Sequence, residues 1–76
     1  MIKNNPIRVY IKLNHNKEII DINSDVFILD FSNWIKIDEG YGDKYAHAQN
    51  NYFPKRIVNE KGIYNYKYLN GRIYEV

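Results

Sequence analysis

The sequence predicts a mainly β fold: one small domain over residues 1–76, built as a single antiparallel sheet of hairpins with one glycine-rich irregular loop. Three observations support this prediction. Tyrosine is abundant, with eight residues, and aromatic side chains favour pleated surfaces. Apolar and polar residues alternate over residues 7–13, which is the period of a strand with one buried face. Near the C-terminus, Asn70-Gly71 separates two further runs of this kind, and this pair favours a type I′ hairpin turn.

The first strands follow from the alternation and from the turn residues between them. The run 7–13 and the run 18–22 flank the turn-rich tetrad 14–17, so together they predict a hairpin. The apolar run 26–29 comes next. Ser24 and Asp25 would suit the start of a short helix, but Val26-Phe27-Ile28-Leu29 is a poor helix sequence, and we predict a third strand there.

The second half begins with a strand over residues 34–38, which places Ile35 and Ile37 on one face. Gly40 and Gly42 then stand one residue apart, which predicts an irregular stretch over residues 39–54. Within this stretch, the residues 45–49 fit either one helical turn or a short strand. A brief strand is predicted over residues 56–58.

The C-terminal hairpin is expected to pair residues 63–69 with 72–76. With a two-residue turn, Leu69 lies opposite Arg72, and the pairing continues along the strands to Tyr66 opposite Glu75. A three-residue loop with a bulge would shift this register by one residue. In the first register, three tyrosines share one face of the hairpin with Ile73, and we expect this aromatic face to pack on the core or on a partner. Its members are Tyr64, Tyr66 and Tyr68.

Composition excludes several classes of protein and site. Without cysteine, the chain offers no disulfide, thiol nucleophile or cysteine-type zinc site. Its longest apolar run has four residues, far short of the roughly 20 that span a bilayer. The N-terminus lacks the apolar core of a signal peptide. We therefore expect a soluble chain that is not exported and has no membrane partner.

The net charge of +2 is sorted along the chain, with +4 over residues 1–17, −6 over 18–43 and +4 over 44–76. Basic strands pairing beside an acidic strand would explain this pattern, and we favour that interpretation. The alternative is a positive surface for nucleic acid, with tyrosines interleaved as a stacking platform. Since no RNP-type signature is present, nucleic acid is not the expected partner.

The run 38–43 carries three carboxylates beside two glycines, a composition that Ca²⁺ or Mg²⁺ loops use. It lacks the EF-hand spacing, so a solvated turn is expected rather than a metal site. His47 and Asp43, four residues apart, would suit a base and the group that orients it. No cysteine or Gly-x-Ser-x-Gly context supplies a nucleophile. We therefore expect a non-enzymatic chain, with no catalytic residue, metal or cofactor.

Residues 34–49 have the pattern W-x3-DEG-x-GD-x-Y-x-HAQ. This pattern resembles small proteins and protein segments encoded in the tail-fibre region of phages and prophages of low-GC Gram-positive bacteria, and residues 62–75 resemble their terminal hairpin. The resemblance implies a structural or assembly role in a phage tail. It also implies other tail or tail-fibre proteins, or further copies of the chain, as partners. The expected location is the virion, or the host cytoplasm during assembly.

The alternative function is a small nucleic-acid-binding or inhibitor module of a mobile element. If the chain is instead a phage-tail protein, the motif is a structural loop and interaction surface. Trp34 then covers the adjoining core, and polar side chains hold the loop. Its residues are Trp34, Asp38, Glu39, Gly40, Gly42, Asp43, Tyr45, His47 and Gln49.

Overall fold

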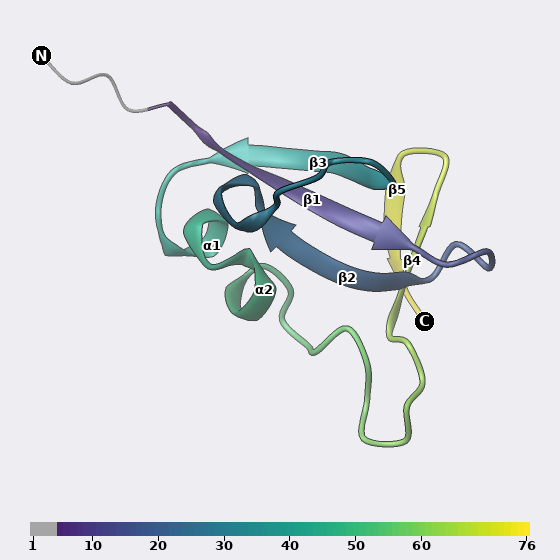
Figure 1. Cartoon of the computed structure of the whole chain (residues 1–76). Helices are drawn as coiled ribbons and strands as arrows, with labels where there is room; N and C mark the ends of the chain where they lie inside the picture. The colour runs from purple at the N-terminus through teal and green to yellow at the C-terminus, as the bar shows by residue number, and fades with distance from the viewer. Residues whose placement is uncertain (1–4) are drawn as a thin grey trace, which may run out of the picture.

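A computed structural model describes residues 5–76; the segment 1–4, on which the expectation about a signal peptide partly rests, lies outside the described residues. The fold is mainly β, as predicted (Figure 1). It has two antiparallel sheets rather than the single sheet expected, one with the strand order β2-β1-β3 and one formed by β4 and β5. The elements are β1 (Ile7–Leu13), β2 (Ile19–Ser24), η1 (Asp25–Phe27), β3 (Trp34–Gly40), α1 (Asp43–Ala46), α2 (Ala48–Asn51), β4 (Tyr66–Leu69) and β5 (Arg72–Glu75).

The N-terminal hairpin is confirmed. Strand β1 has the predicted bounds, and β2 begins one residue later than the predicted run 18–22 and ends two residues beyond it, at Ser24. In the turn, the Asn14 side-chain carbonyl accepts hydrogen bonds from the backbone N–H groups of Asn16 and Glu18, both at 3.0 Å. The pairing sets the basic β1 between acidic neighbours, as the charge pattern predicted, with Lys12 opposite Asp21 on one side and Arg8 opposite Glu39 on the other.

The third strand predicted over residues 26–29 is wrong. Residues 25–27 form the 3₁₀-helix η1, which begins a connector over residues 25–33. Because β2 and β3 pair with opposite edges of β1, this connector must cross β1 (Figure 1). It is held there by Phe31, whose ring packs 4.9 Å from that of Tyr10, and by Asp25, whose carboxylate lies 3.2 Å from Arg8 Nε.

Strand β3 extends two residues beyond the predicted end, so Gly40 is a strand residue opposite Ile7 and not part of an irregular loop. The remainder of that stretch forms the short helices α1 and α2. The turn between β3 and α1 requires Gly42, since its φ of 102° and ψ of −179° lie in a region open essentially to glycine alone. Of the two conformations considered for residues 45–49, the helical one is present.

The predicted strand over residues 56–58 is also wrong. Val58 makes only an isolated bridge with Tyr64, so residues 63–65 stay outside β4. The hairpin turn itself is confirmed: Leu69 pairs with Arg72, and the series continues to Tyr66 opposite Glu75. Asn70 and Gly71 have φ angles of 52° and 78°, as the type I′ turn demands.

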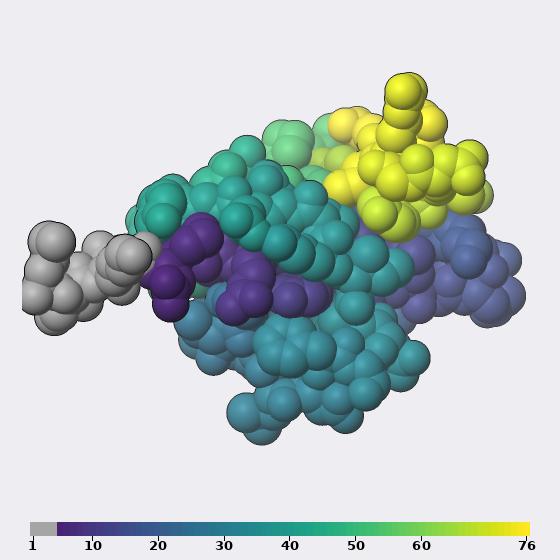
Figure 2. Space-filling model, turned by 90° about the horizontal axis from the view of Figure 1, so that it is seen from above, coloured from purple at the N-terminus to yellow at the C-terminus, as the bar shows by residue number. Residues whose placement is uncertain are grey.

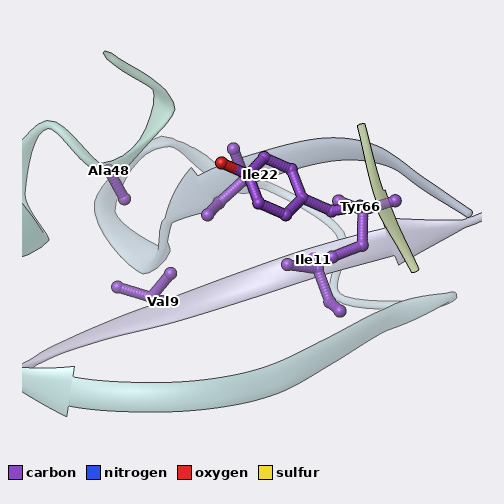
Figure 3. Packing of buried hydrophobic residues seen from close by; sticks show 6 residues of the cluster. Val9, Ile11, Ile22, Ala48 and Tyr66 are labelled. Carbon is purple, nitrogen blue, oxygen red and sulfur yellow. The ribbon is translucent and has the colours of Figure 1, made fainter. Parts of the chain in front are cut away.

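The core lies on the inner face of the three-stranded sheet, between the sheet, α2 and β4. Figure 3 shows its side chains converging from four elements. Hairpin β4–β5 lies across the end of this sheet and is joined to it by a bridge between Glu18 and Lys67 and by a hydrogen bond from Tyr68 N–H to Lys17 O (2.9 Å). The buried cluster comprises Val9, Ile11, Ile19, Ile22, Ala48 and Tyr66.

Candidate functional site

A β-bulge decides where the acidic part of the motif lies. The register shifts so that Lys36 opposes Tyr10 while Asp38 opposes Val9, which leaves Ile37 as the extra residue. Without the bulge, Asp38 would share the outer face of the sheet with Lys36. With it, Asp38 turns toward the core side, where its Oδ2 accepts a hydrogen bond of 2.8 Å from the Tyr52 hydroxyl.

The Tyr52 hydroxyl is held in its protonated form more strongly than a free phenol. Partial burial and the hydrogen bond to the Asp38 carboxylate raise the pKa of Tyr52 well above its usual range. The hydrogen bond joins β3 to the segment that follows α2, and we call the pair the clasp.

Gly40 provides the second contact that packs the motif. A Cβ atom added at Gly40 would lie 2.6 Å from Cε2 and Cζ of Tyr45, so the Tyr45 ring rests directly on the strand backbone. Tyr45 in turn meets the ring of Tyr52 edge-on, with centroids 6.2 Å apart. The glycine is thus needed for close approach of a ring, which is a packing role.

The aromatic rings continue from this point toward the C-terminal hairpin. Phe53 lies 5.3 Å from Tyr52 and stacks on Tyr66 at 4.3 Å, with the two ring planes 16° apart. Lys44 adds a cation–π contact, its Nζ standing 4.9 Å from the centroid of the Tyr52 ring. The row of rings connects the motif to β4 through the core.

Ser24, at the end of β2, ties the two short helices to the sheet. It is fully buried, its hydroxyl donates to the backbone carbonyl of Tyr45, and it accepts a 3.3 Å hydrogen bond from the backbone N–H of Ala48. A buried hydroxyl must be paired to be tolerated, and here both of its partners belong to the helical segment. In the sequence, Ser24 had suggested only the possible start of a short helix.

The structure separates the remaining motif residues. Trp34 lies on the outer face under the ammonium of Lys12, 4.7 Å from Nζ, and does not cover the core as expected. Glu39 forms an ion pair with Lys36 on the same outer side. Three others are exposed on the helical segment: Asp43, His47 and Gln49.

Within residues 5–76, the side chains of Asp43, His47 and Gln49 make no hydrogen bonds that hold this segment, contrary to expectation. The helices are closed by backbone hydrogen bonds such as Ala46 N–H to Gly42 O (2.9 Å). The Asp43 carboxylate and the His47 ring find no hydrogen-bond partner in residues 5–76, and over the same range no three potential metal ligands gather. Among the predicted site residues, Gly40 and Tyr45 pack directly against each other, whereas Asp43, His47 and Gln49 are exposed.

Two of the three C-terminal tyrosines share a face, as predicted: Tyr66 and Tyr68 stand two residues apart on β4 and pack on the core with Ile73, whereas Tyr64 lies outside the strand. Tyr66 is buried in the core, and its hydroxyl accepts a 3.2 Å hydrogen bond from the Lys55 backbone N–H. Tyr68 packs against the edge of the core together with Ile73. Tyr64 lies before β4, in the isolated bridge with Val58.

The most exposed apolar surface lies on the connector, where the sequence prediction had placed a strand. We call it the apolar knob. Its members are Val26, Phe27, Leu29 and Phe31, and Leu29 is fully exposed. Figure 2 shows this blue-teal part of the chain projecting from the body. The sequence contained one indication of it, the possible Ser24-Asp25 helix start, because a helical turn there leaves the following apolar side chains without a sheet face to pack on.

Two hollows accompany the inner side of the fold. One of about 270 Å³ lies between the three-stranded sheet and the hairpin, and we call it the apolar cleft. It is lined by the apolar or aromatic residues Leu13, Ile35, Tyr68 and Leu69 and by the polar residues Lys17 and Asn70. The other, of about 170 Å³, lies beside α2 and is lined by residues that include Gln49, Asn50 and Phe53.

The chain matches no family model, and neither a curated protein nor a solved structure shows significant similarity to it. In residues 5–76, no helix combines the length and apolar character that crossing a membrane requires.

Proposed function

We propose that this protein is a non-enzymatic protein–protein interaction module of a phage or prophage tail, acting as a structural or assembly accessory component. The resemblance of residues 34–49 to tail-fibre-region proteins supports the setting. The packing of the motif agrees with a structural role, since Gly40 contacts the Tyr45 ring and Asp38 accepts a hydrogen bond from Tyr52.

The observation that carries the proposal is the apolar knob. Four large apolar side chains are exposed within six residues of one connector. Exposed apolar patches of this kind on small proteins mark interaction sites. The connector is also anchored at both ends, by Asp25 to Arg8 and by Phe31 to Tyr10, so it presents the knob in a fixed position. A fixed apolar surface loses little conformational entropy on binding a protein partner.

The alternative, a nucleic-acid-binding module, receives less support from the same surface. A stacking platform needs open rings and free cations, whereas Tyr10 is partly covered by Phe31. Arg8 and Lys36 on the outer face are each paired with a carboxylate. Pairing of this kind reduces the attraction of the face for phosphates.

The proposal can be tested on particles of the phage or prophage whose genome encodes the chain. We expect mass spectrometry to find the protein in purified particles or in tail-assembly intermediates. We also expect the purified chain to bind at least one tail protein encoded beside it, and Leu29→Asp to weaken that binding. Ile63→Asp is the matched control, because Ile63 is equally an exposed apolar residue but lies on another loop.

Two outcomes would overturn the proposal. One is absence of the protein from particles and intermediates together with no binding to any tail protein. The other is sub-micromolar binding to single-stranded DNA that weakens steeply with salt, which would favour the nucleic-acid module instead.

A further inference from the structure

The apolar knob and the apolar cleft lie on opposite faces of the same sheet. Phe31 of the knob packs on Tyr10, which alternates along β1 with the buried Val9 and Ile11 and so marks the outer face. Ile35 of the cleft pairs with Ile11 and belongs to the inner face. Figure 2 shows the same separation, with the knob projecting on one side and the yellow hairpin on the other. A chain therefore cannot fill its own cleft with its own knob.

The cleft has the size and lining for an apolar side chain. Its volume is about 270 Å³, and it is open to solvent on one side, so a side chain of another molecule can enter it. Its walls are Leu13, Ile35, Tyr68 and Leu69. The most exposed knob residue, Leu29, is a branched aliphatic side chain that such walls would cover.

Charges beside the two surfaces are complementary. Asp30 follows Leu29 directly, and its Oδ1 accepts a 2.9 Å hydrogen bond from the Ser32 backbone N–H, which orients the carboxylate at the base of the knob. Lys17 is one of the residues that line the cleft, and within residues 5–76 its ammonium has no carboxylate partner. A Leu29 side chain seated in the cleft would bring an Asp30 carboxylate near a Lys17 ammonium.

From these features we propose that a second copy of this chain occupies the cleft: the knob of one copy inserts between Leu13, Ile35 and Leu69 of the next, with Asp30 beside Lys17. The contact joins two different surfaces, so it is heterologous and leaves a free knob and a free cleft at the ends of each assembly. Rings or linear arrays follow, rather than closed two-fold dimers. This inference deepens the proposed function. It rests on that proposal only in so far as both assign the apolar knob as a binding surface.

The strength of this contact is limited by its size. A patch of four exposed apolar side chains covers on the order of 300–600 Å², below the roughly 800 Å² that each partner buries in standard stable complexes. We therefore expect weak association that becomes apparent at high concentration, or when copies are held side by side in a larger assembly.

Mixing two complementary variants tests the proposal. Leu29→Asp places a charge at the most exposed residue of the knob and keeps the cleft, whereas Leu69→Asp places a charge in the cleft and keeps the knob. Both positions are exposed, so neither substitution disturbs the core. In sedimentation velocity from about 10 µM to about 1 mM, the range of weak complexes, the unaltered chain should grow beyond a dimer. Each variant alone should associate at least about tenfold more weakly.

The equimolar mixture of the two variants should form a 1:1 dimer that grows no further, because only one intact knob and one intact cleft remain. A charge exchange gives an independent readout: Lys17→Glu and Asp30→Lys should each weaken association, and the double variant should restore it. Ile63→Asp is the control and should associate like the unaltered chain.

Three results would overturn the self-association: a monomeric unaltered chain at about 1 mM, a mixture that associates no better than either variant alone, or a dimer that stays a dimer at every concentration. These results leave the proposed function standing if tail proteins still bind the knob. Conversely, a chain that forms arrays but binds no tail protein and is absent from particles would keep this inference and refute the proposed function.

Discussion

Replacing Gly40 by alanine gives a direct test of how the motif packs. The added Cβ would approach two atoms of the Tyr45 ring to 2.6 Å, far inside the 3.5–4.0 Å at which carbon atoms rest against each other. The ring has to move, and its edge contact with Tyr52 moves with it. Overpacking typically costs about 1–3 kcal/mol, whereas exchanging a strand glycine for alanine gains about 0.5–1 kcal/mol. We expect Gly40→Ala to lower the free energy of unfolding by about 0.5–2 kcal/mol.

Urea denaturation followed by circular dichroism measures this difference, and the same substitution in a Tyr45→Ala background supplies the control. Without the ring, the added methyl group meets no obstacle. Gly40→Ala should then be neutral or stabilise the protein by up to about 1 kcal/mol. The difference between the two backgrounds is the coupling energy of the pair. Equal destabilisation in both backgrounds, or a gain in the unaltered chain, would refute the proposed contact.

Three further predictions concern the turn, the clasp and the exposed polar residues. Gly71→Val should cost about 1 kcal/mol or more, because a β-branched residue resists the φ of 78° found there, and an unchanged melting temperature would contradict this. Tyr52→Phe deletes the hydrogen bond to Asp38 and should cost about 1 kcal/mol in urea denaturation. Because folding raises the pKa of Tyr52, the contribution of its hydroxyl to the free energy of unfolding is complete below about pH 10 and is lost as the pH rises further. Above that pH, the unaltered chain should therefore lose stability more steeply than Tyr52→Phe. Parallel plots of stability against pH for the two proteins would count against the clasp. Asp43→Asn and His47→Gln should each change stability by less than about 0.5 kcal/mol, and chelator should leave the melting temperature unchanged; a rise of several degrees with Ca²⁺ that Asp43→Asn abolishes would reveal a missed metal site.

The parts of the fold that the sequence predicted well are those determined by neighbouring residues. Strand β1 has the predicted bounds, since alternation at period two is a local property. The register of the last hairpin follows from Asn70-Gly71 for the same reason. Pairing between distant segments was harder to predict. The apolar run from Val26 to Leu29 resembles a strand in isolation, but the need to cross β1 makes it a connector.

In the candidate site, too, contacts between residues close in sequence were easier to predict than contacts between distant ones. The motif included Gly40 and Tyr45, which are in close contact, yet spacing could not show that a bulge at Ile37 turns Asp38 inward. The partner of Asp38, Tyr52, lies outside the motif, so the pair became visible only in three dimensions. Asp43 and His47, which suggested chemistry by their spacing, are exposed and without a shared centre.

The central position of β1 has a consequence for the order of events during synthesis. Both of its neighbours follow it along the chain, so β1 leaves the ribosome with two unpaired edges. One edge pairs with β2 as soon as that strand has emerged, because only a short turn separates the two strands. The second stays open until the connector and β3 have also left the ribosome, and throughout that interval an unpaired strand edge is available to other nascent chains. The connector that exposes the knob in the finished protein thus also sets how long the growing chain stays vulnerable.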